Sequence, residues 1–491
     1  MNKTGIDNSL FNTGRNSETG FRPSGAGDSH SSASATHWPR RAFSRTIAGF
    51  FAKSALCAFV LSVSFGLPAY ADVRPTDEIV SEPISSSGMA EALCPDIQAE
   101  NALLISEDGT VYFSRDASDP VKIASITKVM TAIVALENAS LDTVVTVDEE
   151  AATVGESSAG LLQGDSMDLR TALYALMVPS GNDAAVAIAK CVGSLLPSYD
   201  GTNALEAFVA AMNEKAEELG CSDTLYSNPH GLDADGYESD AHSTAADVGI
   251  VVSYAMENDL FREIVDAGDT SIVVQDAQGQ DREINLVSTD ELIGVYEGIC
   301  GVKTGTTIEA GYCFAGAVSR DEGEFYSVVL GSPDSDARFA DTVTLFDWMY
   351  GNIVEQRLIN ADSFVDYQGA QAPLVANVAH TEWVDCLVPA TVLDPDIAVR
   401  VFSLAGDIEQ NVTYRDLKGD VFAGDVVGSI EFVQNETTVA SCDLIAASDV
   451  AAPNIFQQIG VLFDRAVREF QNQPLQATSV CLNTPSPVSD R

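Results

Sequence analysis

Apolar and polar positions along the chain predict a first region in which strands flank a set of helices. Residues 101–117 contain two runs of strand character around Asp108-Gly109, a pair that is typical of a tight hairpin turn. Residues 125–138 are apolar on nearly every side, which indicates a buried helix. Helical periodicity continues over residues 167–193, with a break at 179–181, and over residues 201–220 and 242–258.

Strand patterns return after these helices. Residues 298–307 and 311–320 predict the two strands of a hairpin, and residues 324–331 predict a third strand. Strands at both ends with helices between them predict an α+β domain over about residues 90–352. We expect residues 72–89 to form a linker before it.

The pattern changes after residue 362. Short β-rich runs separated by turn residues predict a small all-β domain over residues 362–449, and residues 450–491 form a tail with an amphipathic helix. This helix is too short to span a bilayer. It can lie on a membrane surface or pack on its own domain, and the sequence leaves both possibilities open. Its apolar positions share one helical face: Ile455, Ile459, Leu462, Ala466 and Phe470.

Residues 1–71 have the composition of a polar leader and a secretory signal. Residues 1–36 are rich in serine and glycine, and we expect them to be disordered. Arg40 and Arg41 fit a twin-arginine signal or an ordinary secretory one, and an uncleaved anchor is a further alternative. The protein is therefore expected to be exported, to the cell wall or the outer face of the cytoplasmic membrane. The signal elements follow in the usual order: basic residues up to Arg45, an apolar run over 55–67, and Ala69-Tyr70-Ala71 as the cleavage site.

The chain has 26 basic and 72 acidic residues and a formal net charge of -46. Such a charge repels nucleic acid and anionic membrane surfaces, so no nucleic-acid partner is expected. Nine cysteines are present, and Cys57 falls within the apolar run of the signal. The other eight can be free thiols or disulfides, because an exported protein permits both. Proximity in sequence suggests three pairs: Cys191 with Cys221, Cys300 with Cys313, and Cys386 with Cys442.

Candidate chemistry begins with Ser125 and Lys128, three residues apart at the start of the predicted buried helix. Serine is a poor nucleophile until a base removes its proton, and the few histidines stand in no triad-like context. Residues i and i+3 share a helical face, and the positive end of the helix dipole favours a developing alkoxide. Lysine acts as a base only when burial or a second cation lowers its pKa.

Two further motifs supply what this pair needs. Lys303-Thr304-Gly305 lies within the strand predicted over residues 298–307. It offers a second cation and a hydroxyl, and its glycine permits close approach of a substrate backbone. Ser180-Gly181-Asn182 lies at the break between two predicted helices, where a hydroxyl and an amide can point into a cleft. A lysine-threonine-glycine run arises by chance on the order of 0.1 times in such a chain. The ordered set of three motifs is therefore specific.

These motifs, with "SSAGLLQGDSMDLRTALYALMVPSGNDAAVAIA" and "GVKTGTTIEAGYCFAGAVSRD", resemble those of the low-molecular-mass penicillin-binding proteins, the serine-type D-alanyl-D-alanine carboxypeptidases. The resemblance covers about residues 90–352, and more faintly the β domain. It implies a β-lactamase/transpeptidase-like antiparallel sheet with helices on both sides, and removal of the terminal D-alanine from peptidoglycan stem peptides. It also implies acylation by β-lactams, which would make them covalent inhibitors.

The resemblance also implies residue roles. Ser125 would be the nucleophile and Lys128 its base. A second group would assist catalysis: Ser180 as proton relay, Asn182 as a ligand of the substrate amide, and Lys303 as a tuning cation. A third group would bind substrate: Thr304, Gly305, Thr306 through its backbone amide, and Arg338 near the terminal carboxylate. Arg338 could instead be a plain surface arginine that starts a helix.

Other functions remain to be weighed. A β-lactamase would need a glutamate-activated water, and the second motif here reads Ser-Gly-Asn, with no convincing segment to supply that glutamate. A crosslink endopeptidase would use the same three motifs. A non-catalytic wall-binding protein would not need Ser125, Lys128 and Lys303 together. His230 and His242, with Asp233 nearby, fit no common zinc spacing, so we expect neither a metal nor a cofactor.

Overall fold

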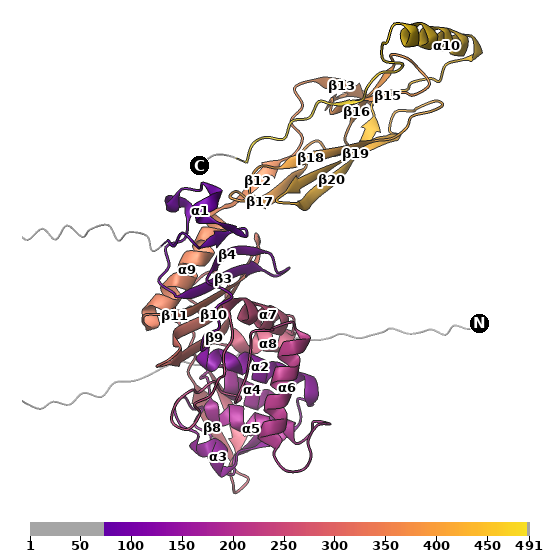
Figure 1. The fold of residues 1–491 in the computed structure, drawn as a ribbon. Helices are drawn as coiled ribbons and strands as arrows, with labels where there is room; N and C mark the ends of the chain where they lie inside the picture. The colour runs from indigo at the N-terminus through magenta and orange to yellow at the C-terminus, as the bar shows by residue number, and fades with distance from the viewer. Residues whose placement is uncertain (1–72, 489–491) are drawn as a thin grey trace, which may run out of the picture. The chain divides into compact units, whose positions relative to one another are not determined.

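The computed structural model describes residues 73–488 (Figure 1). The predicted leader and signal, including Arg40, Arg41 and the cleavage site, lie outside the described residues. Export therefore stays a prediction from sequence.

A seven-stranded sheet forms the first part of the described chain, in the order β2-β1-β4-β3-β11-β10-β9. Our expectation that residues 72–89 form a linker is wrong, because β1 and β2 lie within them and β1 pairs with β4. All of the sheet's pairings are antiparallel, and the three strands predicted over residues 298–331 pair as consecutive neighbours. Strand β9 lies at the edge of the sheet, so one side of it has no strand neighbour. The strands are β1 (Glu78–Ile79), β2 (Glu82–Pro83), β3 (Asn101–Ser106), β4 (Val111–Arg115), β9 (Ile299–Thr307), β10 (Gly311–Arg320) and β11 (Gly323–Ser332).

Helices cover both faces of this sheet, as expected (Figure 1). Because strand residues alternate between faces, Leu103 belongs to the core under α2 and α7, whereas Ala102 and Leu104 belong to the core under α9. The helices are α1 (Ile84–Ser87), η1 (Glu91–Leu93), η2 (Ala124–Thr127), α2 (Lys128–Asn138), α3 (Glu149–Thr153), α4 (Leu169–Met177), α5 (Asn182–Gly193), α6 (Ala204–Glu218), α7 (Ala245–Met256), α8 (Asp259–Val265) and α9 (Ser335–Gly351).

A four-stranded sheet beside the helices was not predicted. Its strands pair in the order β5-β6-β7-β8. Two of them have only three residues, too few for alternation to stand out from the surrounding loops. The strands are β5 (Val144–Thr146), β6 (Ser166–Asp168), β7 (Thr270–Gln275) and β8 (Asp281–Leu286).

The second part of the chain is β-rich, as predicted, with one six-stranded and two two-stranded sheets. Strand β21 (Val480–Cys481) comes from the segment that we expected to be a tail, and it pairs with β15. Helix α10 (Ile455–Phe470) lies between them in sequence. The other strands are β12 (Ile353–Arg357), β13 (Phe364–Tyr367), β14 (Ala370–Pro373), β15 (Ala376–Ala379), β16 (Leu387–Thr391), β17 (Ala398–Phe402), β18 (Glu409–Tyr414), β19 (Val426–Gln434) and β20 (Thr437–Ala446).

The three suggested disulfides are wrong for this structure, because all eight cysteines that it describes are free. Strand register excludes the pair Cys300 and Cys313. Cys313 pairs with Gly305, whereas Cys300 lies five residues earlier on the same strand, about 16 Å away along it. A disulfide needs Cα atoms within about 7 Å. The Cys191 and Cys221 thiols donate to different carbonyl oxygens, of Val144 and Asp247. Cys442 and Cys386 are also separated by strand register. The strands β16 and β20 pair only at Ala390 and Thr391, whereas Cys386 precedes the other end of β16.

Candidate active site

The Ser125 hydroxyl lies 2.8 Å from the Lys128 amine, which donates to it. Ser125 belongs to the 3-10 turn η2, which directly precedes α2. Our expectation that Ser125 lies in the first turn of the α-helix is therefore wrong. The two side chains still meet, because residues i and i+3 are eclipsed in a 3-10 turn. The spacing in the sequence therefore predicted the contact correctly, although not the type of helix.

Lys128 is fully buried and also donates to the backbone oxygen of His230 at 2.9 Å. Burial is the main cause that holds its pKa well below the usual value, and the nearby positive charge of Lys303 lowers it further. Asp183 opposes both effects. A lysine that is neutral in the resting state can accept the proton of an adjacent hydroxyl.

The turn that carries Ser125 packs closely against two glycines, Gly231 and Gly305. Ala124 has φ 47°, which is uncommon for a residue with a side chain. A Cβ at Gly231 would lie 1.9 Å from the Ala124 carbonyl oxygen, and one at Gly305 would lie 2.7 Å from that of Ile123. Gly305 thus makes room for the turn of the nucleophile, a role that we did not predict for it.

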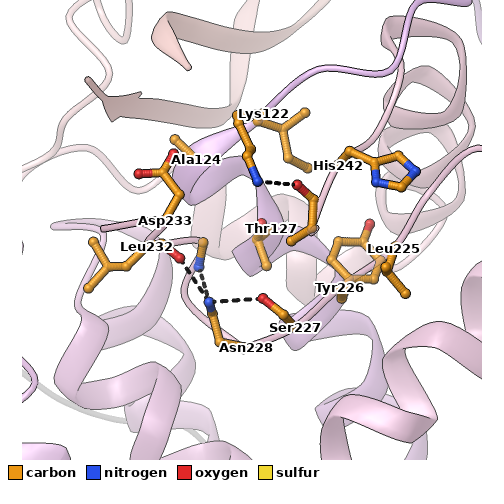
Figure 2. A pocket seen from close by; sticks show the side chains of 13 residues that line it. Lys122, Ala124, Thr127, Leu225, Tyr226, Ser227, Asn228, Leu232, Asp233 and His242 are labelled. Atoms are coloured by element: carbon orange, nitrogen blue, oxygen red, sulfur yellow. Dashed lines mark hydrogen bonds between the residues drawn. The ribbon is translucent and has the colours of Figure 1, made fainter. Parts of the chain in front are cut away.

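The loop before His230 is folded by Asn228, which sequence patterns did not single out. Its side-chain oxygen accepts from the Gly231 amide at 2.6 Å, and its amide nitrogen donates to the Leu232 oxygen at 2.9 Å (Figure 2). Behind the nucleophile turn, a cavity of about 20 Å³ lies between this loop and Lys122 (Figure 2). That volume suits about one water molecule. Asn228 therefore positions both the His230 oxygen and Gly231.

The second motif lies at the start of α5, as its helix break predicted. Ser180 is nearly buried and has φ 62°, a strained conformation of the kind found at functional sites. Asn182 donates to the Gly155 oxygen at 3.0 Å, which leaves its own side-chain oxygen buried with no hydrogen-bond partner among residues 73–488. Gly181 has no room for a side chain, since a Cβ would lie 2.5 Å from the Ala175 oxygen.

Asp183 anchors the loop that faces this motif. Its carboxylate accepts from the amides of Ala159 and Leu161, both at 3.0 Å, and from the hydroxyl of Ser158 at 2.6 Å. It is buried, with 1% of its surface exposed. Asp183 lies in the first turn of α5, where its negative charge interacts favourably with the positive end of the helix dipole. Its loop contacts are an additional function.

The third motif lies on the edge strand β9. Lys303 is buried and donates to the Thr304 oxygen at 2.9 Å. Burial and the charge of Arg338 lower the pKa of Lys303 to about 7, against the opposing charge of Asp290. The Thr304 hydroxyl donates to the hydroxyl of Thr289 at 2.7 Å, a partner that the sequence did not reveal.

Arg338 is buried in the first turn of α9, so its interpretation as a plain surface arginine is wrong. Its guanidinium donates to the Thr306 hydroxyl at 3.0 Å, and its Nε is buried without a partner among the described residues. Arg338 therefore adds positive charge behind the edge strand, next to Lys303.

A cleft of about 870 Å³ opens in front of these motifs. Of the predicted site residues, Ser125, Asn182 and Thr306 line it. Lys128, Lys303 and Arg338 are buried behind its wall. Sequence patterns missed the rest of the lining, because most of it lies on loops with no recognisable motif and the remainder at the ends of β9 and β10. The loops supply residues 154–157, 232–235, Tyr237, Ile308 and Pro333, and the strand ends supply Thr307, Gly311 and Tyr312.

The family model described as D-alanyl-D-alanine carboxypeptidase matches residues 88–334. These residues make up half of the chain and include all three motifs. The chain belongs to this family of serine peptidases. Arg338 lies just beyond the matched segment.

Relatives in this family are 24–32% identical to the chain over the aligned residues. D-alanyl-D-alanine carboxypeptidase DacF of Bacillus subtilis is 29% identical over 52% of this chain, and the match spans 62% of that relative. D-alanyl-D-alanine carboxypeptidase of Streptomyces sp. strain K15 is 31% identical over 49% of this chain and 82% of its own length. The crystal structure of the carboxypeptidase DacD from Francisella tularensis covers 72% of this chain and 94% of its own, with a TM-score of 0.50 and 22% identity. That similarity confirms the fold.

Proposed function

We propose that the chain removes the terminal D-alanine from peptidoglycan stem peptides through an acyl-enzyme on Ser125. Neutral Lys128 takes the hydroxyl proton as Ser125 attacks the carbonyl carbon of the penultimate D-alanine. The backbone amides of Ser125 and Thr306 stabilise the oxyanion. Collapse of this intermediate returns the proton to the leaving nitrogen, and free D-alanine departs. Water then attacks the ester, Lys128 again acts as base, and Ser180 relays the proton.

Substrate binding uses the positive charge behind β9. Lys303 and Arg338 attract the terminal carboxylate, and Thr304 donates a hydrogen bond to it. In the free enzyme the Thr304 hydroxyl donates to Thr289, so this proton must turn from Thr289 to the substrate. The unpartnered oxygen of Asn182 accepts the amide N–H of the peptide that enters the cleft. An unpaired buried acceptor costs free energy, which the substrate recovers on binding.

One observation carries the proposal: the 2.8 Å contact between Lys128 and Ser125 in a buried setting. A wall-binding protein has no use for a lysine whose pKa is strongly lowered beside a serine. A β-lactamase that carries aspartate between the serine and the asparagine of this motif would require a side chain at position 181, where there is no space for a Cβ. The same nucleophile can be acylated by β-lactams, which places them among the proposed inhibitors.

The test is D-alanine release from a peptide that ends in D-Ala-D-Ala, with Ser125→Ala as the matched control. Release by the wild type that the control abolishes supports the proposal. Mass analysis after incubation with penicillin should find the adduct on Ser125 alone. A folded protein that neither releases D-alanine nor binds penicillin covalently contradicts the proposed activity.

We further propose that α10 rests on the surface of a lipid bilayer. Its apolar side chains are exposed, whereas its opposite face carries Arg465, which donates to the Thr381 oxygen at 2.6 Å, and Arg468, which pairs with Asp385. The polar face thus holds the helix on the β-rich region, and the apolar face needs another cover. No helix within residues 73–488 is long and apolar enough to cross a membrane. The exposed apolar residues are Ile455, Phe456, Ile459, Leu462, Phe463 and Phe470.

Such a position requires export, which the sequence of residues 1–71 favours. An exported enzyme held at the outer face of the membrane would meet newly made stem peptides there. The negative net charge of the chain favours neutral lipid over anionic lipid.

A further inference from the structure

The edge strand β9 is bonded to a cation on one side and to an anion on the other. Arg338 bonds to Thr306 on one side of the strand. The next residue, Thr307, donates to the carboxylate of Asp233 at 2.6 Å. Successive strand residues point to opposite faces, so a cation and an anion are attached to the same strand on opposite sides. Of the two, Asp233 lines the cleft.

Two more carboxylates line this cleft beside Asp233. Glu156 comes from the loop after α3, and Asp235 from the loop after His230, so they reach the cleft from different segments. Both are exposed, and neither makes an ion pair or side-chain hydrogen bond within the described part of the chain. No lysine, arginine or histidine is among the residues that line the cleft. Unpaired negative charge therefore faces any peptide that occupies it.

A second feature of this cleft is a buried hydrogen-bond acceptor that a bound peptide can satisfy. The buried side-chain oxygen of Asn182 has no partner among residues 73–488, although Asn182 is 1% exposed and lines the same cleft. Its amide nitrogen is held by the oxygen of Gly155, the residue before Glu156. The Asn182 side chain, which can accept a peptide N–H, is thus bonded to the loop that carries the Glu156 carboxylate.

We propose that Glu156, Asp233 and Asp235 form a subsite for a cationic side chain in the peptide that precedes D-Ala-D-Ala. This inference rests on the proposed function, since Ser125 in the same cleft fixes where the scissile bond lies. A residue spans at most about 3.6 Å along an extended chain, so the residue before D-Ala-D-Ala lies close to Ser125. Tyr237, which also lines the cleft, can face the cation with its ring.

The chemistry of the subsite distinguishes two states of a diamino residue. A free side-chain amine is protonated and is attracted by the carboxylates. An acylated amine, as in a crosslinked peptide, has no charge and would leave the carboxylates unpaired. The enzyme should therefore prefer stem peptides that are not crosslinked through that amine, which bears on the choice between carboxypeptidase and endopeptidase.

The experiment compares two peptides: Nα-acetyl-L-lysyl-D-alanyl-D-alanine, and the same peptide with its side-chain amine also acetylated. We expect the wild type to show a kcat/KM for D-alanine release about tenfold higher on the free amine, because two or three ion pairs supply on the order of that ratio. The preference should shrink as salt rises from low to about 0.5 M. Glu156→Gln combined with Asp235→Asn should bring the ratio of the two peptides towards one.

The control variant combines Asp142→Asn with Glu217→Gln. It removes the same charge from exposed positions outside the cleft, and its ratio should equal that of the wild type. Equal rates of the wild type on both peptides would overturn the subsite while the carboxypeptidase stands. A preference that survives the cleft double variant would overturn it as well. Failure to release D-alanine from either peptide would instead reject the proposed function, and the subsite with it.

Discussion

Gly231 lies so close to the carbonyl oxygen of Ala124 that a methyl group on its α-carbon would be 1.9 Å from that oxygen. Ala124 directly precedes Ser125, so anything that moves its carbonyl moves the nucleophile. Its own conformation, with φ 47°, persists because the surroundings hold it.

Replacing Gly231 by alanine should therefore displace Ser125 from Lys128 and lower kcat about 10²-fold or more. Gly231 also has φ 86°, so the variant combines steric clash with backbone strain. Gly236→Ala separates the two, because Gly236 has φ 101° in the same loop and open space around it. We expect this control to lose stability by about 1 kcal/mol and to keep most of its activity. Equal loss of kcat in both variants would contradict the positioning role of Gly231.

The three motifs could be predicted from sequence because each is a short run on a regular element. Ser125 and Lys128 are separated by a fixed helical spacing, which brings their side chains together whether the turn is 3-10 or α. Thr289 and Asn228 could not be predicted in this way. They reach the motifs from loops, and only the tertiary fold brings Thr289 to Thr304 from 15 residues away.

The unpredicted β5–β8 sheet and the wrong cysteine pairs likewise depend on contacts between distant residues. The small β5–β8 sheet joins strands about 100 residues apart through a single paired position between β6 and β7, and no local pattern encodes such a contact. Cysteine proximity in sequence also failed as a guide, since strand register separates Cys300 from Cys313. In contrast, each predicted strand and helix has a local pattern, and the fold class followed from the order of these elements along the chain.

The alkaline limb of the pH profile should depend on Lys303. Its pKa is lowered to about 7, and the protonated form attracts the substrate carboxylate, so kcat/KM should fall as pH rises through this value. The charge of Arg338 disfavours protonated Lys303. Arg338→Gln should therefore move this limb to higher pH, in addition to lowering kcat/KM. The measurement is kcat/KM between about pH 5 and 10.

Arg357→Gln is the control for this profile, because Arg357 is 60% exposed and pairs with Asp396 outside the site. We expect its alkaline limb to coincide with that of the wild type. A limb that stays in place in Arg338→Gln would show that Lys303 does not set it.

Asp183→Asn should weaken the loop beside the cleft and lower the pKa of Lys128. The amide can accept hydrogen bonds only at one oxygen, so part of the loop over Ser158 to Leu161 loses its anchor, at a cost of about 1–3 kcal/mol. The negative charge of Asp183 also raises the pKa of Lys128. Its removal should lower that pKa further, so Lys128 stays neutral at lower pH and the acid limb of kcat/KM moves down. Thermal unfolding and the pH profile measure the two effects.

Asp168→Asn provides the comparison, because Asp168 caps α4 through the Thr171 amide at 2.8 Å and lies outside the cleft. This variant should lose at most about 1 kcal/mol of stability and leave the acid limb where it is. A purely structural role for Asp183 predicts the same unmoved limb in both variants.

The last prediction concerns the exposed face of α10. Phe456 is 85% exposed and Phe463 72%, so burial of both rings in a bilayer interface should contribute about 3–6 kcal/mol. Replacing both by serine should lower cosedimentation with neutral phosphatidylcholine vesicles at least tenfold. Release of D-alanine from a soluble peptide should stay the same, because neither residue lines the active-site cleft.

Gln471→Ser at the C-terminal end of the same helix is the matched control, since it changes an exposed polar side chain outside the apolar face and should retain vesicle binding. Anionic vesicles discriminate further. The net charge of -46 should weaken binding to them at low salt, and added salt should restore it, because screening removes repulsion without weakening apolar burial. Wild-type protein that stays in solution with both kinds of vesicle would show that the apolar face has another partner.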